Sequence, residues 1–450
     1  DVVSTLWGMW WFQQHGASAL LGAPTEVLNF PHGAYGVVLS PISAICWAML
    51  EPLFGIGRAL ALVSWLQVLA VSFGCHLLAR QSGLERRHSY FAAVAPIIGS
   101  YLFFGIGEGS IVAVTISPLP YGLVALIAAS RKNGRWYHAV LAGLCMVLSG
   151  LENPYLALVL PFVAFLLWVF RGRDGGRIRL SLGMVAGCIG VLAIASLFSK
   201  GANPNYPNPN DIAGDLVPLF GRNWLVVDQP WARLGWTEIF LPRSPQWTVD
   251  ASSATTATGG RYLGISILLL CIVGMVKSSV SRWWVLFSFG GILLSLGSLN
   301  GGFAFPFMFM NALMDAVARP LTQATRFLGL AVVGFSVAAA HGLKFLDERN
   351  PRFLMAACGF LALDGFLLGG LSLRPPVTEL PELSCSQKLV GPVLIWPWDA
   401  IDGEKSTSQL YQIVHGQPAA HTGIASWRLT DDQRVEDSLR GMGFRKMSNQ

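Results

Sequence analysis

Residues 111–135 have the sequence IVAVTISPLPYGLVALIAAS followed directly by RKNGR. An apolar run of about 20 residues is the length that a helix needs to cross the hydrocarbon core of a membrane. Basic residues directly after such a run are typical of short loops on the cytoplasmic side. This stretch therefore predicts a transmembrane helix that ends in a cytoplasmic connector.

Four further connectors repeat this pattern, so that short Lys- and Arg-rich stretches separate apolar runs along the chain. The five connectors hold 15 of the 31 Lys and Arg residues, whereas the first 54 residues hold none. Because positive charge in short loops marks the cytoplasmic side, we expect all five on one side of a membrane. They are residues 80–88, RKNGR at 131–135, RGRDGGRIR at 171–179, KSSVSR at 277–282 and KFLDERNPR at 344–352.

The amino-acid composition indicates the same class of protein. The chain is 53% hydrophobic and 12% charged, and its mean hydropathy is +0.52. Soluble domains are about 25% charged, so we predict a polytopic membrane protein. The net charge of +6 then reflects membrane orientation, and no nucleic-acid partner is expected. Six of the seven cysteines lie singly in apolar segments and Cys385 stands alone in the polar tail, so no disulfide framework is implied.

Ten membrane-spanning helices are predicted, in an all-α polytopic domain over residues 55–372. Residues 1–54 then form a first extracytoplasmic segment, 199–261 a long outer loop, and 373–450 a small extracytoplasmic α/β domain. Because the chain starts without an initiator Met, we expect a further span before Asp1 and a terminal domain that is cut short. The predicted spans are 55–79, 89–105, 111–130, 136–151, 153–170, 180–198, 262–276, 283–300, 325–343 and 353–372.

One apolar segment, residues 35–50, does not fit this alternation. As an additional span it would move the first basic connector, 80–88, to the outside. We therefore predict a helix that lies at the outer membrane interface, with which Pro41 and Trp47 are compatible.

Ionisable side chains at the outer ends of membrane helices are functional candidates, because membrane depth makes such groups costly. Glu108 and Glu152 fall in two short outer loops, and a carboxylate can act as general base for a hydroxyl group. Arg319 and Arg326 bracket RPLTQATRF, and an arginine pair can bind a phosphate. Loop hydration for the carboxylates and anchoring to lipid headgroups for the arginines stay open as alternatives.

The remaining candidates come from the first outer segment and the last span. Asp1 starts the outer face, and His15 and His32 follow on the same segment, where hydrogen bonding within a loop is the simpler role for a histidine. Asp364 lies inside the last predicted span and has no predicted role. No metal, nucleotide-binding or Ser-His-Asp motif occurs, so the sequence predicts no particular cofactor, and a divalent metal stays open.

The order of several motifs resembles the bacterial multispanning membrane glycosyltransferases of the GT-C superfamily, particularly poorly characterised members with a short C-terminal α/β domain. The similarity spans nearly the whole chain, but each motif is degenerate and the order carries the resemblance. The motifs are DVVSTLWGMWW, NFPHG at 29–33, GEGSIVAVTISPLPYGLVAL at 107–126, YLGISILLLCIVGM, LLSLGSL, RPLTQATRFLGLAVVGFSVAAAHGL at 319–343, PVLIWPWD and LRGMGF. In the third, the family usually has His where this chain has Glu108.

The resemblance implies an enzyme of the bacterial cytoplasmic membrane that uses a polyprenyl-phosphate-linked sugar donor and an extracytoplasmic acceptor. In this superfamily a carboxylate on the first outer loop acts as base or orients the acceptor, and Asp1 is the matching position. We accordingly expect Asp1 and Glu108 to be catalytic. The residues expected to bind substrate are Glu152, Arg319, Arg326 and His32.

Two other functions compete with this interpretation. The chain could be a non-catalytic subunit of a membrane assembly, with its outer segments as a docking surface for membrane protein partners. It could also transport or flip lipid-linked sugars. Transporters commonly show inverted repeats and broken helices, whereas no convincing internal repeat occurs here and the predicted spans carry few midplane charges. Loss of sugar transfer on mutation of Asp1 would favour the enzyme over both.

Overall fold

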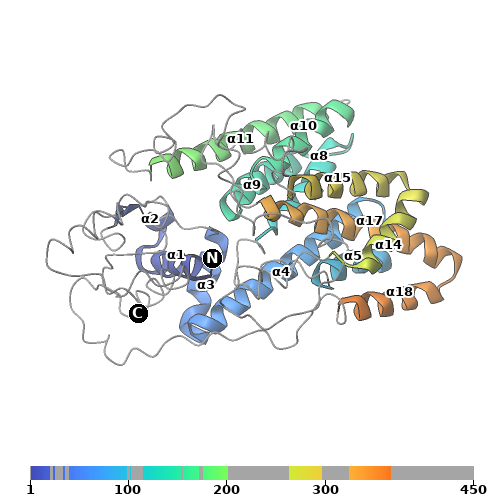
Figure 1. Cartoon of the computed structure of the whole chain (residues 1–450). Helices are drawn as coiled ribbons and strands as arrows, with labels where there is room; N and C mark the ends of the chain where they lie inside the picture. Colours follow the sequence, from blue (N-terminus) through green and yellow to red (C-terminus); the bar gives the residue numbers. More distant parts are fainter. Residues whose placement is uncertain are drawn as a thin grey trace, which may run out of the picture.

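Helices make up almost all of the secondary structure in the described part of the chain (Figure 1). The described residues also contain one antiparallel pair of two-residue strands, β1 (Pro24–Thr25) and β2 (Ala34–Tyr35). The computed structural model describes residues 2–20, 24–25, 34–35, 40–98, 102, 115–153, 156–171, 176–200, 263–295 and 324–365. The predicted α/β domain and most of the predicted long outer loop lie outside these residues.

Each of the ten predicted spans contains a helix. Among the described residues, three helical segments are long and apolar enough to cross a membrane: α4, α17 and the Gly176–Ala193 part of α11. The chain is therefore a helical membrane protein, while the number of crossings stays a prediction. The helices are α4 (Ile56–Gln81), α5 (Arg86–Ile98), α8 (Pro118–Ser130), α9 (Trp136–Glu152), α10 (Val159–Arg171), α11 (Gly176–Lys200), α14 (Ile265–Lys277), α15 (Ser279–Ser295), α17 (Leu328–Arg349) and α18 (Arg352–Leu363).

The structure shortens two of the predicted connectors. Between α14 and α15, only Ser278 is not helical, and its Oγ accepts a hydrogen bond from the Ser281 N–H at 3.3 Å, as an N-cap residue does. Helix α17 continues through most of the connector 344–352, where Lys344 and Glu348 form an i,i+4 pair at 3.7 Å. Basic composition therefore marked the ends of these helices rather than separate loops.

Helix α17 forms the centre of one half of the bundle. Every residue from Leu328 to Leu343 is buried, and the helix packs against both α14 and α15. Glycines allow this close approach: a Cβ on Gly274 would lie 2.7 Å from the Ala338 carbonyl oxygen, and one on Gly334 would lie 2.9 Å from that of Trp284. Small residues at helix crossings are typical of membrane proteins, where packing drives association.

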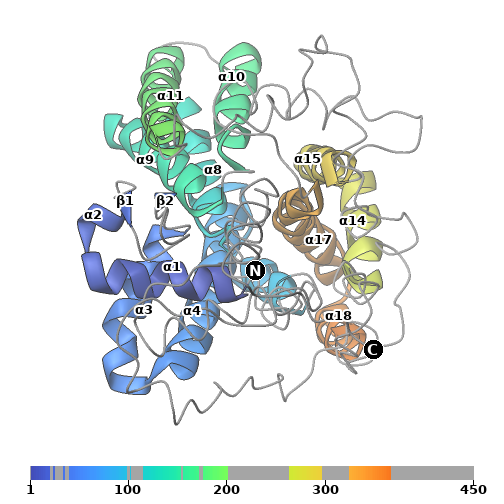
Figure 2. The same ribbon diagram turned by 60° about the vertical axis from the view of Figure 1, so that its left-hand side comes forward.

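The N-terminal segment packs at one end of the bundle, on the first half of α4 (Figure 2). It contains α1 (Val2–His15), α2 (Ala17–Leu20) and α3 (Pro41–Phe54). Its hydrophobic core is separate from the main one and includes Trp11, Met9 and Trp47. The predicted interfacial helix at 35–50 thus corresponds to α3, which begins at Pro41. We call this end of the bundle the α3 end.

The five basic connectors meet at the opposite end, which we call the basic end. In Figure 1 the turns α14–α15 and α17–α18 lie far from α1–α3. Contacts among the connectors run from Arg131 to the Gln81 carbonyl oxygen (2.5 Å), from Arg179 to that of Arg131 (2.6 Å), from His88 to Asp347 (2.9 Å) and from Lys277 to the Phe345 ring (5.2 Å). The chain therefore has one end rich in positive charge and one that carries the N-terminal segment.

Candidate functional site

Glu152, the last residue of α9, lies fully buried at the α3 end. Its Oε1 accepts a hydrogen bond from the Ile42 N–H at 2.5 Å, and its Oε2 accepts one from Ser43 Oγ at 3.2 Å. Both donors belong to the first turn of α3, where backbone N–H groups have no partner within the helix. A carboxylate there also interacts favourably with the positive end of the helix dipole. Glu152 therefore caps α3 from another helix.

A chain of buried polar side chains extends from this carboxylate. Gln67 on α4 donates from Nε2 to Ser43 Oγ at 2.9 Å, and Ser117, just before α8, donates from Oγ to Gln67 Oε1 at 2.7 Å. These side chains are all buried. Buried networks whose members are satisfied fix a unique arrangement of the elements that supply them. Four elements are joined in this way: α3, α4, α8 and α9.

The backbone carbonyl of Glu152 is a second junction. It accepts hydrogen bonds from Ser40 Oγ and Thr115 Oγ1, each at 3.0 Å. Ser40 has φ 58° and ψ 65°, in the left-handed region, which costs about 1–2 kcal/mol for a residue other than glycine. The bond to Glu152 stabilises that backbone turn directly before α3. The side chain and the backbone carbonyl of Glu152 therefore both bind the start of α3.

The electrostatic environment of Glu152 favours its neutral form more than water does. Glu152 lies outside the three candidate spans. Burial raises the pKa of its carboxyl to about 7, although the hydrogen bonds from Ile42 and Ser43 act in the opposite direction and lower it. Burial, and then the nearby Glu152 charge, also raise the pKa of the Cys46 thiol on α3. A carboxyl with this pKa can exchange a proton near neutral pH.

Asp364, for which the sequence predicted no role, repeats this arrangement in the other half of the bundle. Its Oδ2 accepts hydrogen bonds from the Ser266 N–H at 2.7 Å and from Ser266 Oγ at 2.5 Å. Ser266 is in the first turn of α14, so Asp364 caps that helix from beyond α18. Sequence reasoning missed this role because the two residues are 98 positions apart.

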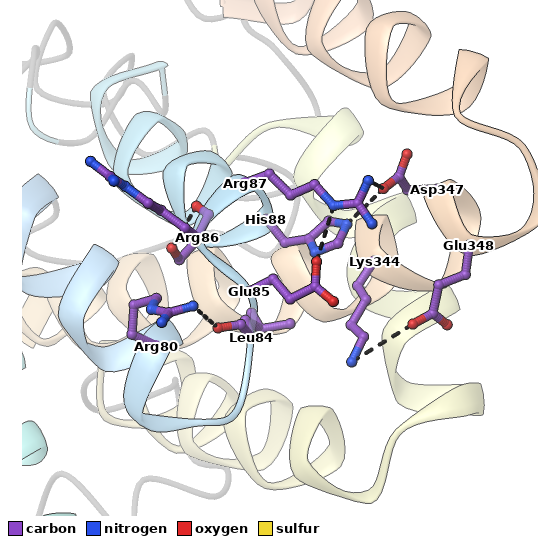
Figure 3. Close-up of polar contacts among 10 residues, drawn as sticks. Arg80, Leu84, Glu85, Arg86, Arg87, His88, Lys344, Asp347 and Glu348 are labelled. Carbon is purple, nitrogen blue, oxygen red and sulfur yellow. Dashed lines mark hydrogen bonds and ion pairs between the residues drawn. The ribbon is translucent and has the colours of Figure 1, made fainter.

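A buried ion pair ties α5 to α17 at the basic end (Figure 3). Asp347 Oδ2 lies 2.9 Å from His88 Nε2 and 3.1 Å from an Arg87 side-chain nitrogen, and Arg87 also pairs with Glu85 at 3.2 Å. His88 and Asp347 have side chains that are at most 1% exposed, whereas Arg87 and Glu85 are largely exposed. This cluster holds helices together and lies at the end opposite Glu152.

The predicted site residues have different outcomes. Glu152 is brought together with Ser43, Gln67 and Ser117, none of which sequence reasoning had selected. Arg326 is half-buried in the short helix η5 (Ala324–Phe327) and interacts with neighbouring groups. His15 stacks on Trp11 at 3.5 Å, and its Nδ1 lies 3.3 Å from the Trp11 carbonyl oxygen. Four predicted residues lie outside the described residues: Asp1, His32, Glu108 and Arg319.

Within the described ranges, no group of three or more His, Cys, Asp or Glu side chains could hold a metal ion. Comparisons with known proteins give no family: no protein-family model matches the chain, and no curated protein matches it.

Proposed function

We propose that this chain is a membrane glycosyltransferase that moves a sugar from a polyprenyl-phosphate donor to an acceptor outside the cytoplasm. The observation that carries the proposal is the separation of the two ends of the bundle. The packed N-terminal segment and Glu152 lie at one end, and all five basic connectors at the other. The motif order of the GT-C superfamily supports the same arrangement, with a reaction site on the first outer segment.

Exposed aromatic side chains support a membrane interface at the basic end. Each basic connector has an exposed aromatic residue within two positions, and Trp and Tyr rings favour the headgroup level of a membrane. These residues are Tyr90, Trp136, Phe170, Trp283 and Phe353, whose exposed fractions are 48%, 57%, 71%, 60% and 46%. Under the positive-inside rule the basic end then faces the cytoplasm, and the α3 end faces outwards across ten spans.

The reaction would be an inverting displacement at the anomeric carbon of the donor sugar. The acceptor hydroxyl oxygen forms a bond to that carbon, while the bond from the carbon to the phosphate oxygen breaks and its electron pair leaves with the lipid phosphate. Asp1 takes the proton of the acceptor hydroxyl as general base. Arg319 and Arg326 stabilise the charge on the leaving phosphate, since guanidinium groups match its oxygens. Glu108 and His32 orient the substrates.

A non-catalytic subunit of a membrane assembly is the second candidate function. Two observations favour it: the carboxylates of Glu152 and Asp364 both accept hydrogen bonds from helix starts, and both are at most 3% exposed. Carboxylates used in this way contribute to folding and do not require a substrate. A divergent chain can retain a fold after its chemistry is lost.

Transfer of labelled sugar from a panel of polyprenyl-phosphate donors distinguishes the two functions. The purified chain would be assayed in lipid vesicles beside Asp1→Asn and a charge-matched control in the predicted outer loop, Asp211→Asn. The proposal expects transfer by the parent and the control and its loss in Asp1→Asn. Fixed-stoichiometry copurification with other membrane proteins, together with no transfer by folded parent from any donor, would favour the subunit.

A further inference from the structure

We propose that Glu152 is a positioning residue: it sets the first outer segment on the bundle and does not itself touch a substrate. The inference rests on the proposed function only for its kinetic consequences. Its structural content, that one buried carboxylate holds α3 against α9, stands on the geometry alone. It replaces the expected role of Glu152 in binding substrate.

Glu152 joins three parts of the chain that are remote in sequence: the end of α9, the start of α3 and the segment before α8. Its carboxylate binds Ile42 and Ser43, 110 and 109 positions away, and its carbonyl binds Ser40 and Thr115. One residue at the end of α9 therefore holds both the start of α3 and the segment that leads into α8.

Helix α3 packs tightly against α1, so the two helices form one unit. The two helices pack through the separate N-terminal core, where Met9 and Trp11 of α1 and Trp47 of α3 are fully or almost fully buried. Gln13 on α1 also donates from Nε2 to Glu51 Oε2 on α3 at 2.8 Å. Asp1 precedes α1 by one residue in the sequence. A displacement of the α3 start would thus be passed on to the helix that follows the proposed base.

In this arrangement the Glu152 carboxyl has no accessible atom that could contact a substrate. Glu152 is 0% exposed, and each of its side-chain oxygens already accepts a hydrogen bond from α3. A residue that must receive a hydroxyl or a phosphate needs an accessible atom. The left-handed backbone of Ser40 beside it is a strained conformation that surrounding contacts must hold, as is common where a site is positioned.

Asp364 offers a matched control, because it caps α14 with the same chemistry and lies in the other half of the bundle. The variants are Glu152→Ala, which removes the acceptors, Glu152→Gln, which keeps an acceptor for the Ile42 N–H, and Asp364→Ala. Amide hydrogen exchange would be measured in lipid nanodiscs for peptides that cover α3 and α14. We expect Glu152→Ala to speed exchange at the α3 start by about tenfold or more, since the hydrogen bonds from the Ile42 N–H and Ser43 Oγ lose their acceptor. Asp364→Ala should do so only at α14.

Kinetics of sugar transfer separate a positioning role from a catalytic one. A positioning role predicts that Glu152→Ala lowers kcat while the donor KM stays near the parent value, and that Glu152→Gln restores most of kcat. The proposal is overturned if α3 exchange in Glu152→Ala equals that of the parent. It is also overturned if Glu152→Gln abolishes transfer while α3 stays protected, because the acid itself would then be needed. A parent without transfer would refute the proposed function, and the exchange result would still decide what Glu152 holds.

Discussion

Gly342, at the crossing of α14 and α17, should tolerate no side chain at all. A Cβ built on this residue would overlap the Leu270 carbonyl oxygen and would lie 2.9 Å from the Leu270 carbonyl carbon and 3.0 Å from the Gly274 nitrogen. These neighbours are backbone atoms, so no rotation of a side chain can relieve the overlap. The two helices must move apart, and α17 is the most buried helix among the candidate spans.

The expected size of the effect follows from two opposing terms. Overpacking in a core costs about 1–3 kcal/mol, and the backbone overlap places Gly342→Ala at the upper end of this range. Replacement of glycine by alanine inside a helix contributes about 0.5–1 kcal/mol in the stabilising direction. The net change is a loss of about 2 kcal/mol in the free energy of unfolding.

Gly290 on α15 provides the control, because a Cβ there meets no atom within 4 Å. Gly290→Ala should leave the thermal unfolding midpoint unchanged or raise it, whereas Gly342→Ala should lower it in the same detergent. Tryptophan fluorescence can follow both transitions, since Trp284 on α15 is buried in the main hydrophobic core. If Gly342→Ala is as stable as Gly290→Ala, the close packing described for α14 and α17 is wrong.

Two further predictions concern buried charges. Asp347→Asn should destabilise the protein by about 1–3 kcal/mol, because it removes the buried carboxylate that pairs with His88 and Arg87. Glu348→Gln, in a largely exposed pair, should change stability by about 0.5 kcal/mol or less, and denaturant unfolding of the two variants compares them. The pKa of the Glu152 carboxyl rises from 4.5 to about 7 on folding, so the folded protein holds this proton more tightly than the unfolded chain. The stability that this proton contributes is complete below pH 4.5 and is lost as the pH rises to about 7. The unfolding midpoint of the parent should therefore fall more steeply over that pH range than that of Glu152→Gln, and parallel curves for the two proteins would contradict this assignment.

Local sequence patterns predicted where the helices lie. The run 111–130 contains α8, which covers Pro118–Ser130, and the basic residues after it lie at the basic end, because apolar runs and loop charge are local properties. That this helix crosses a membrane stays a prediction. The same patterns could not rank the helices by burial. Helices α4 and α17 are similarly apolar, yet their most apolar windows are 44% and 83% buried. Glycines do not rank the two helices either, because a Cβ on Gly74 of α4 would lie 2.6 Å from Pro120 and one on Gly334 of α17 would lie 2.9 Å from the Trp284 carbonyl oxygen.

The candidate site was predicted only in part, for a physical reason. The position of Glu152 at the end of a span marked it as costly to bury and hence worth selecting. Its partners could not be identified, because Ser43 and Gln67 are ordinary polar residues whose roles arise when α3 and α4 meet α9. The same holds for Asp364, whose partner Ser266 lies on a helix remote in sequence.

The proposed site requires the α3 end and the basic end to face opposite compartments, and cysteine labelling tests this most directly. Ser18 on α2 and Lys132 beside α8 are both exposed and would each be replaced by Cys in a chain without its native cysteines. A membrane-impermeant maleimide should label Ser18→Cys in intact cells and Lys132→Cys only after permeabilisation. Labelling of Lys132→Cys in intact cells, with protection of Ser18→Cys, would contradict the orientation and with it the extracytoplasmic site.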